Sequence, residues 1–244
     1  KILVDVGKIF NINYKTLIHI GAAVECIHAY SLIHDDLPCM DDDDLRRGKV
    51  STHKKFGEST AVLAGNSLLT MSFEILTDNK LKLSYEKKNL LINFISKSSG
   101  HTGIAGGQFS DLNFERKKIS LSKIIDMQIK KTGKLFSFCC LAPILIIGRK
   151  NEIRRFNNIG ENIGLLFQIV DDLIDYKGNS KKAGKKTNKD QKKGKATLIS
   201  LLGYKNTVKY INNLKFNIFK NLKKFGYKAS DLKDTINYIM VRSK

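Results

Sequence analysis

Proline is scarce in this chain, and no long uninterrupted hydrophobic run occurs. Only Pro38 and Pro143 are present among 244 residues, a length that fits one large domain or two small ones. Because proline interrupts regular structure, its scarcity and the long segments of helical hydrophobic periodicity predict an all-α fold. The longest apolar run, Phe136 to Ile147, is too short to span a bilayer, so we expect no transmembrane segment.

Cysteine is also scarce, and its pattern excludes two kinds of site. The four cysteines show neither the spacing of metal ligands nor a disulfide framework; they are Cys26, Cys39, Cys139 and Cys140. A chain without a disulfide framework is typical of a reducing compartment. No secretory signal is recognisable, and we therefore expect a cytoplasmic location.

Acidic residues are few, with 23 Asp and Glu against 43 Lys and Arg, which gives a net charge of +20. Such a charge can indicate a nucleic-acid binder, a solvated lysine-rich surface or attraction of anionic substrates. No helix-turn-helix, zinc-finger or aromatic RNA-binding motif accompanies the charge. We therefore expect no nucleic-acid partner, whereas the other two interpretations can hold together.

Hydrophobic periodicity predicts a series of helices separated by polar connectors. The segment 16–36 is apolar nearly all round, which predicts a central buried helix. We expect a polar loop over 45–58 and a charged connector over 111–120. The expected helices cover 1–10, 16–36, 59–77, 84–104, 121–147, 151–175 and 196–203, with a helical hairpin over 206–242 broken at Gly226.

Two clusters of aspartates, each joined to an apolar helical segment, are the most informative feature. The first comprises Asp35, Asp36 and Asp41 to Asp44, and the second comprises Asp171, Asp172 and Asp175. Carboxylates at the end of a buried helix are unfavourable unless a cation neutralises them. Hard oxygen ligands suit Mg²⁺, which usually keeps waters and bridges to substrate phosphates. The two clusters therefore predict a metal–diphosphate site.

The spacing within each cluster supports this prediction. Asp171 and Asp175 are four residues apart and share a helix face. Acidic groups at a helix C-terminus oppose the macrodipole, so they require a compensating cation. Asp35 and Asp41 are six residues apart, off the helical repeat, and Pro38 between them allows a bulge that turns both toward one point.

The first cluster does not fit a calcium-binding loop. Leu45 would fall at a ligand position, and Arg46 would replace the required glycine. Arg46 and Arg47 directly follow the acidic run. They can form internal salt bridges, or they can hold phosphate groups as bidentate donors.

The segment from Tyr176 to Lys195 directly follows the second cluster and contains nine lysines and three glycines. It can be a solvated disordered loop. It can also be a flexible lid that brings cations onto a diphosphate. Because the segment adjoins the carboxylates, we favour the lid.

Six ordered motifs extend these clusters over nearly the whole chain. They are Ala23 to Pro38 with Arg47-Gly48 and His53 to Glu58, then Gly107-Gln108 with Asp111-Leu112, Lys131-Thr132-Gly133, Phe167 to Asp175, Gly184-Lys185 and Gly194 to Thr197. In this order they resemble the bacterial farnesyl diphosphate synthases, which are short-chain trans-prenyl diphosphate synthases. The resemblance implies one polyprenyl synthase domain over residues 1–244, a homodimer, and the isoprenoid synthase fold with antiparallel helices around a deep central cavity.

The resemblance also implies a reaction and a set of roles. Isopentenyl diphosphate would add head to tail to dimethylallyl or geranyl diphosphate and give the C15 product. Three Mg²⁺ ions would be held by Asp35, Asp41 and Asp171, with support from Asp36 and Asp175. The substrate contacts implied are Arg46, Lys131, Lys185 and Lys195 for the allylic diphosphate, Gln168 and Thr132 for the reacting carbons, and His28 and Arg47 for isopentenyl diphosphate.

Tyr30 lies five residues before Asp35, which places it about 7 to 8 Å deeper along the expected helix. A phenol ring there can close the pocket that receives the growing chain, although it can also be an ordinary core residue. In the resembled family, an aromatic residue at this place accompanies the C15 product. We therefore expect Tyr30 to limit product length.

One part of the family pattern is missing. The Gly-Lys-Arg-x-Arg-Pro motif that usually precedes the segment starting at Lys1 is absent, so we expect an incomplete chain that lacks its N-terminal segment. The alternative is a poorly active or regulatory subunit of a prenyl diphosphate synthase. A non-catalytic subunit would be expected to lose aspartates, but all five key ones are present.

A terpene cyclase of the same fold is disfavoured, because the second cluster is all aspartate and a lysine-bearing segment follows it.

Overall fold

The computed structural model describes residues 1–176 and 197–242. The described residues are predominantly helical, which confirms the all-α prediction, and a hairpin of two two-residue strands is the one sheet among them. The first half contains α1 (Ile2–Ile9), α2 (Tyr14–Asp35), β1 (Leu45–Arg46), β2 (Lys49–Val50), α3 (Thr52–Phe56), α4 (Glu58–Thr77), α5 (Tyr85–Ser99) and α6 (Ile104–Phe114). The second half contains α7 (Leu121–Gln128), a π-helix (Ile129–Gly133), α8 (Lys134–Ile147), a 3₁₀ turn (Lys150–Glu152), α9 (Ile153–Tyr176), α12 (Leu198–Leu222), a second 3₁₀ segment (Lys223–Ala229) and α13 (Ser230–Val241).

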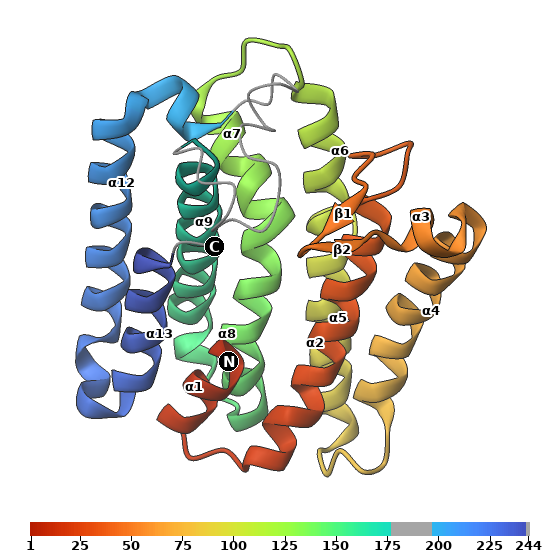
Figure 1. The fold of residues 1–244 in the computed structure, drawn as a ribbon. Coiled ribbons are helices and arrows are strands. Elements are labelled where there is room, and N and C mark those ends of the chain that lie inside the picture. The colour runs from red at the N-terminus through yellow and green to blue at the C-terminus, as the bar shows by residue number, and fades with distance from the viewer. Residues whose placement is uncertain (177–196, 243–244) are drawn as a thin grey trace.

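Helices α8 and α9 form the centre of the bundle and pack against each other (Figure 1). On one side α9 contacts α12 and α13, and on the other α8 contacts α5 and α2. Two hydrophobic clusters result, and α8 contributes to both, for example through Ile144 in one and Phe138 in the other. Ten of the 14 residues of α8 are buried, which explains why this helix carries an apolar sequence on every face.

The prediction of a central buried helix over 16–36 holds for one side of the helix only. One side of α2 is buried, with Leu17, Ile20 and Ile27 in the core, whereas Ile18 is 47% exposed. The longest apolar run, 136–147, lies in α8. By length and composition, however, α2 is the one described helix that could cross a membrane. This is weak evidence for a membrane span, because core helices of soluble proteins pass the same test and α2 packs along α4.

Several connectors differ from the sequence prediction. The expected helix over 84–104 ends at Ser99, and the expected connector over 111–120 begins inside α6. Gly106 and Gly107, which follow the expected helix over 84–104, lie within α6. An added Cβ on Gly107 would lie 2.2 Å from the backbone nitrogen of Lys131, so glycine lets α6 approach the π-helix closely. The expected loop over 45–58 contains the β1–β2 hairpin and α3.

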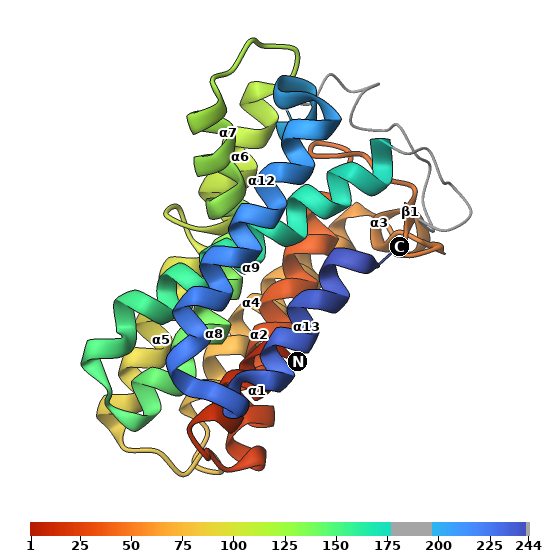
Figure 2. The ribbon, with the colours of Figure 1, turned by 90° about the vertical axis from the view of Figure 1, so that its left-hand side faces the viewer.

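The C-terminal half agrees more closely with prediction. Helix α12 contains a kink at Gly203, where the backbone φ is 71°, and this kink matches the expected gap after residue 203. The expected break at Gly226 is confirmed, because φ is 56° there and the chain reverses into α13. This reversal brings the C-terminal helix back against α9, close to the second aspartate cluster (Figure 2).

Candidate active site

The first acidic cluster is shaped by backbone hydrogen bonds at the C-terminal end of α2. The N–H groups of Asp41 and Asp43 donate to the carbonyl oxygens of Asp35 (2.8 Å) and Asp36 (3.1 Å). Asp42 adopts a left-handed backbone with φ 48°, which aspartate tolerates better than most residues. The chain after Pro38 therefore folds back over the helix end, and the predicted bulge brings the backbones of Asp35 and Asp41 together.

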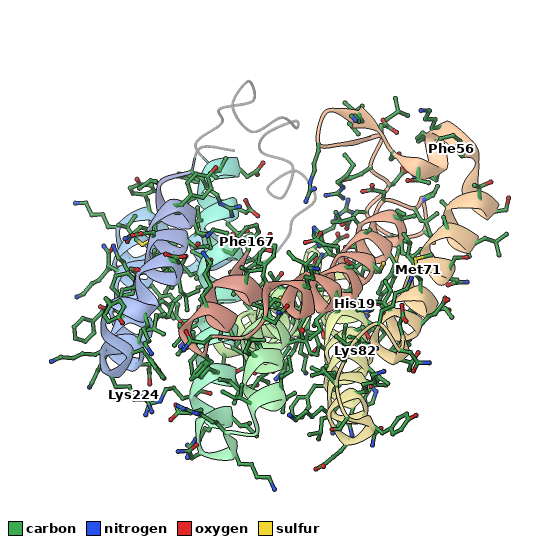
Figure 3. The ribbon with its side chains drawn as sticks, turned by 90° about the horizontal axis from the view of Figure 1, so that it is seen from below. His19, Phe56, Met71, Lys82, Phe167 and Lys224 are labelled. Carbon is green, nitrogen blue, oxygen red and sulfur yellow. The ribbon has the colours of Figure 1, made fainter. Side chains whose placement is uncertain are left out.

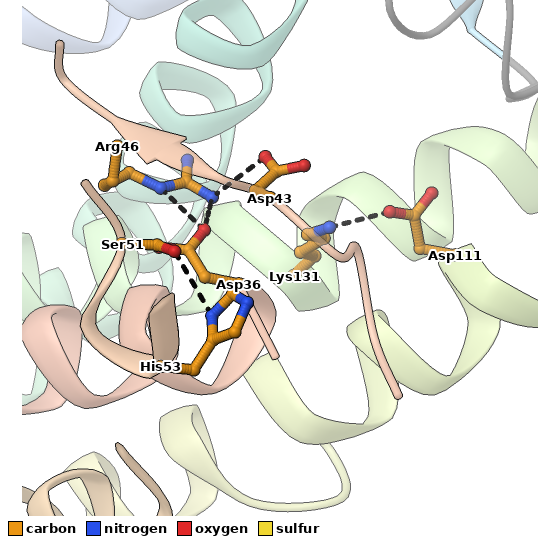
Figure 4. Close-up of polar contacts among 7 residues, drawn as sticks. All are labelled: Asp36, Asp43, Arg46, Ser51, His53, Asp111 and Lys131. Carbon is orange, nitrogen blue, oxygen red and sulfur yellow. Dashed lines mark hydrogen bonds and ion pairs between the residues drawn. The ribbon is translucent and has the colours of Figure 1, made fainter. Parts of the chain in front are cut away.

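Arg46 in strand β1 neutralises the most buried carboxylate of this cluster (Figure 4). Its Nε atom donates to Asp36 Oδ1 at 2.9 Å, and its Nη2 atom contacts Asp36 and, at 3.5 Å, Asp43. Burial alone would lower the pKa of Arg46, but the hydrogen bond and charge of Asp36 outweigh this and raise it. The internal salt bridge left open by the sequence is thus present, and a phosphate contact by Arg46 stays a prediction.

Arg47 and Gly48 form the two-residue turn of the hairpin, with φ values of 52° and 75°. Two successive positive φ values match the twist of a tight hairpin. The turn places Arg47 Nη2 at 3.1 Å from His28 Nε2 in helix α2. Because arginine can only donate, His28 must accept and carries its proton on Nδ1. Burial lowers the pKa of His28, and the charges of Arg47 and Arg46 lower it further against the opposing effect of Glu25. The two predicted contacts of isopentenyl diphosphate are therefore adjacent.

Lys131 and Thr132 lie in a π-helix that the sequence analysis did not foresee. Such segments inside α-helices frequently mark functional sites. Lys131 Nζ contacts Asp111 Oδ2 in helix α6 at 2.6 Å, and Asp111 is buried (Figure 4). Thr132 Oγ1 donates to Gln168 Oε1 in α9 at 3.3 Å. The predicted neighbours of the reacting carbons, Thr132 and Gln168, are therefore brought together.

The second acidic cluster is held by side chains from distant elements. Asp171 Oδ1 accepts from Arg242 Nη2 at 2.9 Å, and the same nitrogen donates to the carbonyl oxygen of Phe167. The guanidinium carbon of Arg242 lies 3.6 Å from the centroid of the Phe167 ring. Burial lowers the pKa of Arg242, and Asp171 partly opposes this effect. Arg242 therefore supplies a compensating cation at the acidic end of α9, from a position that the sequence pattern did not indicate.

Asp172 and Asp175 are more deeply buried than Asp171. Asp172 accepts from Gln128 Nε2 at 3.2 Å and from Gln168 Nε2 at 3.0 Å. Asp175 is 5% exposed, and its Oδ1 atom has no hydrogen-bond partner among the described residues. A buried carboxylate oxygen without a donor is unfavourable unless a cation or water completes the site.

The donor set fits a magnesium ion that is shared with a phosphate ligand. Within residues 1–176 and 197–242, no three His, Cys, Asp or Glu side chains lie close enough to enclose a metal ion by themselves. Mg²⁺ is commonly bound by only one or two carboxylates together with substrate phosphates and water. Carboxylate oxygens at two helix ends and the orphaned oxygen of Asp175 therefore suit a shared site and not a closed protein cage.

Tyr30 lies in the hydrophobic cluster between α2, α5 and α8, and it is 8% exposed. Its hydroxyl donates to the carbonyl oxygen of Ser99 at 3.3 Å, and its ring packs edge-on against His34. Burial raises the pKa of Tyr30, and the charge of Asp35 adds to this effect. The role in product length stays a prediction. Lys185, Lys195 and the lysine-rich segment beyond Tyr176 lie outside the described residues.

Comparison with known proteins assigns the chain to a family. The Polyprenyl synthetase family model matches residues 1–238, and the chain belongs to this family. It is 45% identical over 190 residues to a farnesyl diphosphate synthase of Bacillus subtilis, and this match covers 77% of this chain and 64% of that relative. It is 39% identical to the farnesyl diphosphate synthase of Escherichia coli, and the match covers 98% of this chain and 82% of the relative.

Solved structures confirm the isoprenoid synthase fold expected from the resemblance. An FPP/GFPP synthase from Zymomonas mobilis is 38% identical and superposes with a TM-score of 0.88 over 98% of this chain and 81% of that chain. A geranyltransferase from Helicobacter pylori, solved in complex with magnesium and isoprenyl diphosphate, is 31% identical. It superposes with a TM-score of 0.82 over 97% of this chain and 82% of that chain.

Proposed function

We propose that this chain condenses isopentenyl diphosphate with dimethylallyl or geranyl diphosphate to give farnesyl diphosphate. The observation that carries the proposal is the placement of both acidic helix ends: α2 and α9 finish at the same end of the bundle, beside the π-helix segment (Figures 1 and 2). The relatives named above are farnesyl diphosphate synthases, so no finding favours the regulatory alternative.

In this proposal the carboxylates of Asp35, Asp41 and Asp171 would hold three Mg²⁺ ions together with the allylic diphosphate, and Asp36 and Asp175 would support them. Bound magnesium would stabilise negative charge on the leaving diphosphate. The magnesium complex of a related geranyltransferase supports the choice of metal. Lys131 and Arg46 add positive charge near this group. Both now rest on buried aspartates, which holds the cations in place before the substrate arrives.

The condensation itself requires a cation to survive next to a nucleophile. The allylic C–O bond breaks and C1 bonds to the terminal carbon of isopentenyl diphosphate, which then loses a proton to the released diphosphate. Thr132 and Gln168, whose side-chain oxygens lie 3.3 Å apart, would sit beside the reacting carbons. His28 and Arg47 hold the diphosphate of isopentenyl diphosphate through their contact at the hairpin. Exclusion of water is required, because water would capture the cation.

The proposal includes a homodimer and a cytoplasmic location. Helix α4 lies at the edge of the molecule and exposes Leu63 (66%) and Met71 (45%), and such a strip suits burial against a second copy (Figure 3). Light scattering of the purified chain tests the dimer. The location is supported by the cysteines, all four of which are free, as is typical of a reducing compartment.

The decisive experiment is incubation with labelled isopentenyl diphosphate, geranyl diphosphate and Mg²⁺, followed by chromatographic sizing of the product. We expect a labelled C15 diphosphate that depends on both substrates and disappears with a chelator. Asp171→Asn serves as the matched control for background turnover. A wild-type chain that is folded by circular dichroism but incorporates no label would overturn the proposal.

A further inference from the structure

A continuous chain of hydrogen bonds connects Gln128, the last residue of α7, to the predicted reaction centre. Gln128 Nε2 donates to Asp172 Oδ2 at 3.2 Å, and Asp172 Oδ1 accepts from Gln168 Nε2 at 3.0 Å. Gln168 Oε1 in turn accepts from Thr132 Oγ1 at 3.3 Å. Gln128 could not be recognised from the sequence, because a lone glutamine between apolar residues belongs to no motif.

The direction of every bond in this chain is fixed by its buried carboxylate. An ionised carboxylate only accepts, so each glutamine must turn its NH₂ group toward Asp172. For Gln168 this choice leaves Oε1 on the side of Thr132. If the amide of Gln168 were flipped, its oxygen would face the carboxylate and its NH₂ group would face Thr132 instead.

We propose that Gln128 is a positioning residue that acts through Asp172 and sets which end of the Gln168 amide faces the reacting carbons. This inference rests on the proposed function. An amide oxygen carries partial negative charge, and fixed dipoles of the right sign stabilise charge that develops in the transition state. An NH₂ group at the same place would present partial positive charge to an allylic cation. The neighbouring π-helix is anchored in the same chain of bonds through Thr132.

Packing alone gives no reason for a glutamine at position 128. The side chain is 4% exposed, and its Oε1 atom has no hydrogen-bond partner among the described residues. A buried unpaired carbonyl is destabilising, whereas the bond to Asp172 is stabilising. Methionine has nearly the same length and shape, so Gln128→Met removes the unpaired carbonyl, but it also takes one donor from the buried Asp172 carboxylate. We expect the variant to fold with a modestly lower melting temperature than the wild type.

The kinetic test separates positioning from structure. We expect Gln128→Met to lower kcat about tenfold, the scale at which loss of an outer-shell partner acts in comparable sites, with both KM values within about twofold. Gln128→His, which can donate from Nε2, should recover most of the loss. In a Gln168→Ala background, Gln128→Met should change kcat by less than about twofold, because the group that it orients is gone.

A second measurement needs no turnover. The chain has four glutamines, at positions 108, 128, 168 and 191, so selective ¹⁵N labelling of glutamine side chains gives four NH₂ signals, and Gln168→Ala identifies one of them. Gln128→Met should shift the Gln168 signal and speed its hydrogen exchange. An unshifted Gln168 signal, or a kcat loss that persists undiminished in the Gln168→Ala background, would overturn the inference. Absence of turnover by the wild type would instead overturn the proposed function.

Discussion

The two acidic clusters reach the same end of the bundle by different means. The first is arranged by its own backbone, since residues 35–43 fold back through hydrogen bonds between near neighbours and Arg46 follows ten residues after Asp36. The second lies on a continuous helix, and its carboxylates are held by Gln128 from α7 and Arg242 beyond α13. One cluster is therefore a local structure, whereas the other depends on how the whole chain packs.

This difference predicts that equivalent substitutions in the two clusters act on different properties. Asp171→Asn should lower stability less than Asp36→Asn, because the new amide oxygen can still accept from Arg242, which also keeps its contacts with the carbonyl oxygen and ring of Phe167. It should lower kcat by at least about 10², the scale of a lost charge-stabilising group. Asp36→Asn should lower the free energy of unfolding by about 2 kcal/mol, since it removes the closest carboxylate from Arg46, which is only one third exposed and keeps just the longer contact with Asp43.

Urea denaturation and steady-state kinetics on both variants check this prediction. Asp78→Asn, in the turn after α4, is the control for an aspartate outside both clusters, and it should change kcat little. The contrast between local and assembled clusters fails if Asp171→Asn unfolds the chain as readily as Asp36→Asn does.

The next prediction concerns the chain length of the reaction product and Tyr30, which lies on the same helix as the first cluster. Tyr30→Ala should lengthen the product beyond C15, because removal of the ring opens space between α2 and α5 where Tyr30 now packs. Tyr30→Phe keeps the ring and loses only the bond to Ser99, so it should retain the C15 product. Radio-chromatography of the chain lengths distinguishes the two variants, and an unchanged C15 product from a folded Tyr30→Ala chain would assign Tyr30 to the core alone.

The same contrast explains what could be predicted from the sequence. Asp35, Asp41 and Arg46 were found as one group because their neighbours lie in the same short segment. The salt bridge between Lys131 and Asp111 and the bond between Gln128 and Asp172 join residues 20 and 44 positions apart, so periodicity gave no sign of them. The π-helix was missed for a related reason, since it forms inside a segment whose periodicity predicts a regular helix.

A smaller effect is expected from pH at the hairpin. His28 accepts a hydrogen bond from Arg47, and burial lowers the pKa of His28 below its ordinary value of 6.5. The unfolded chain therefore binds this proton more readily, and the free energy of unfolding should fall as pH drops below about 6.5. At still lower pH the folded His28 gains the proton, cannot accept from Arg47, and the KM for isopentenyl diphosphate should rise.

The variant His28→Gln separates this effect from general acid sensitivity. Its side-chain amide oxygen would lie near the place of the histidine Nε2 atom and would accept without titrating, although Glu25, Arg46 and Arg47 would still surround it. The KM of His28→Gln for isopentenyl diphosphate should therefore change less with pH than that of the wild type. Parallel pH profiles for the two proteins would exclude His28 as the origin of the effect.

The smallest effect tests whether the hairpin turn serves the site or merely the fold. Gly48 has φ 75° at the turn beside Arg47, and Gly148 has φ 72° at the end of α8; an added Cβ meets no atom within 4 Å at either glycine. Alanine should therefore lower the free energy of unfolding by about 1 kcal/mol at both positions through backbone strain alone. Only Gly48→Ala should also raise the KM for isopentenyl diphosphate, because it disturbs the turn that places Arg47 against His28. Equal KM values in the two variants would mean that the locally built region tolerates a distorted turn, and that its precision comes from Arg46 and Asp36 instead.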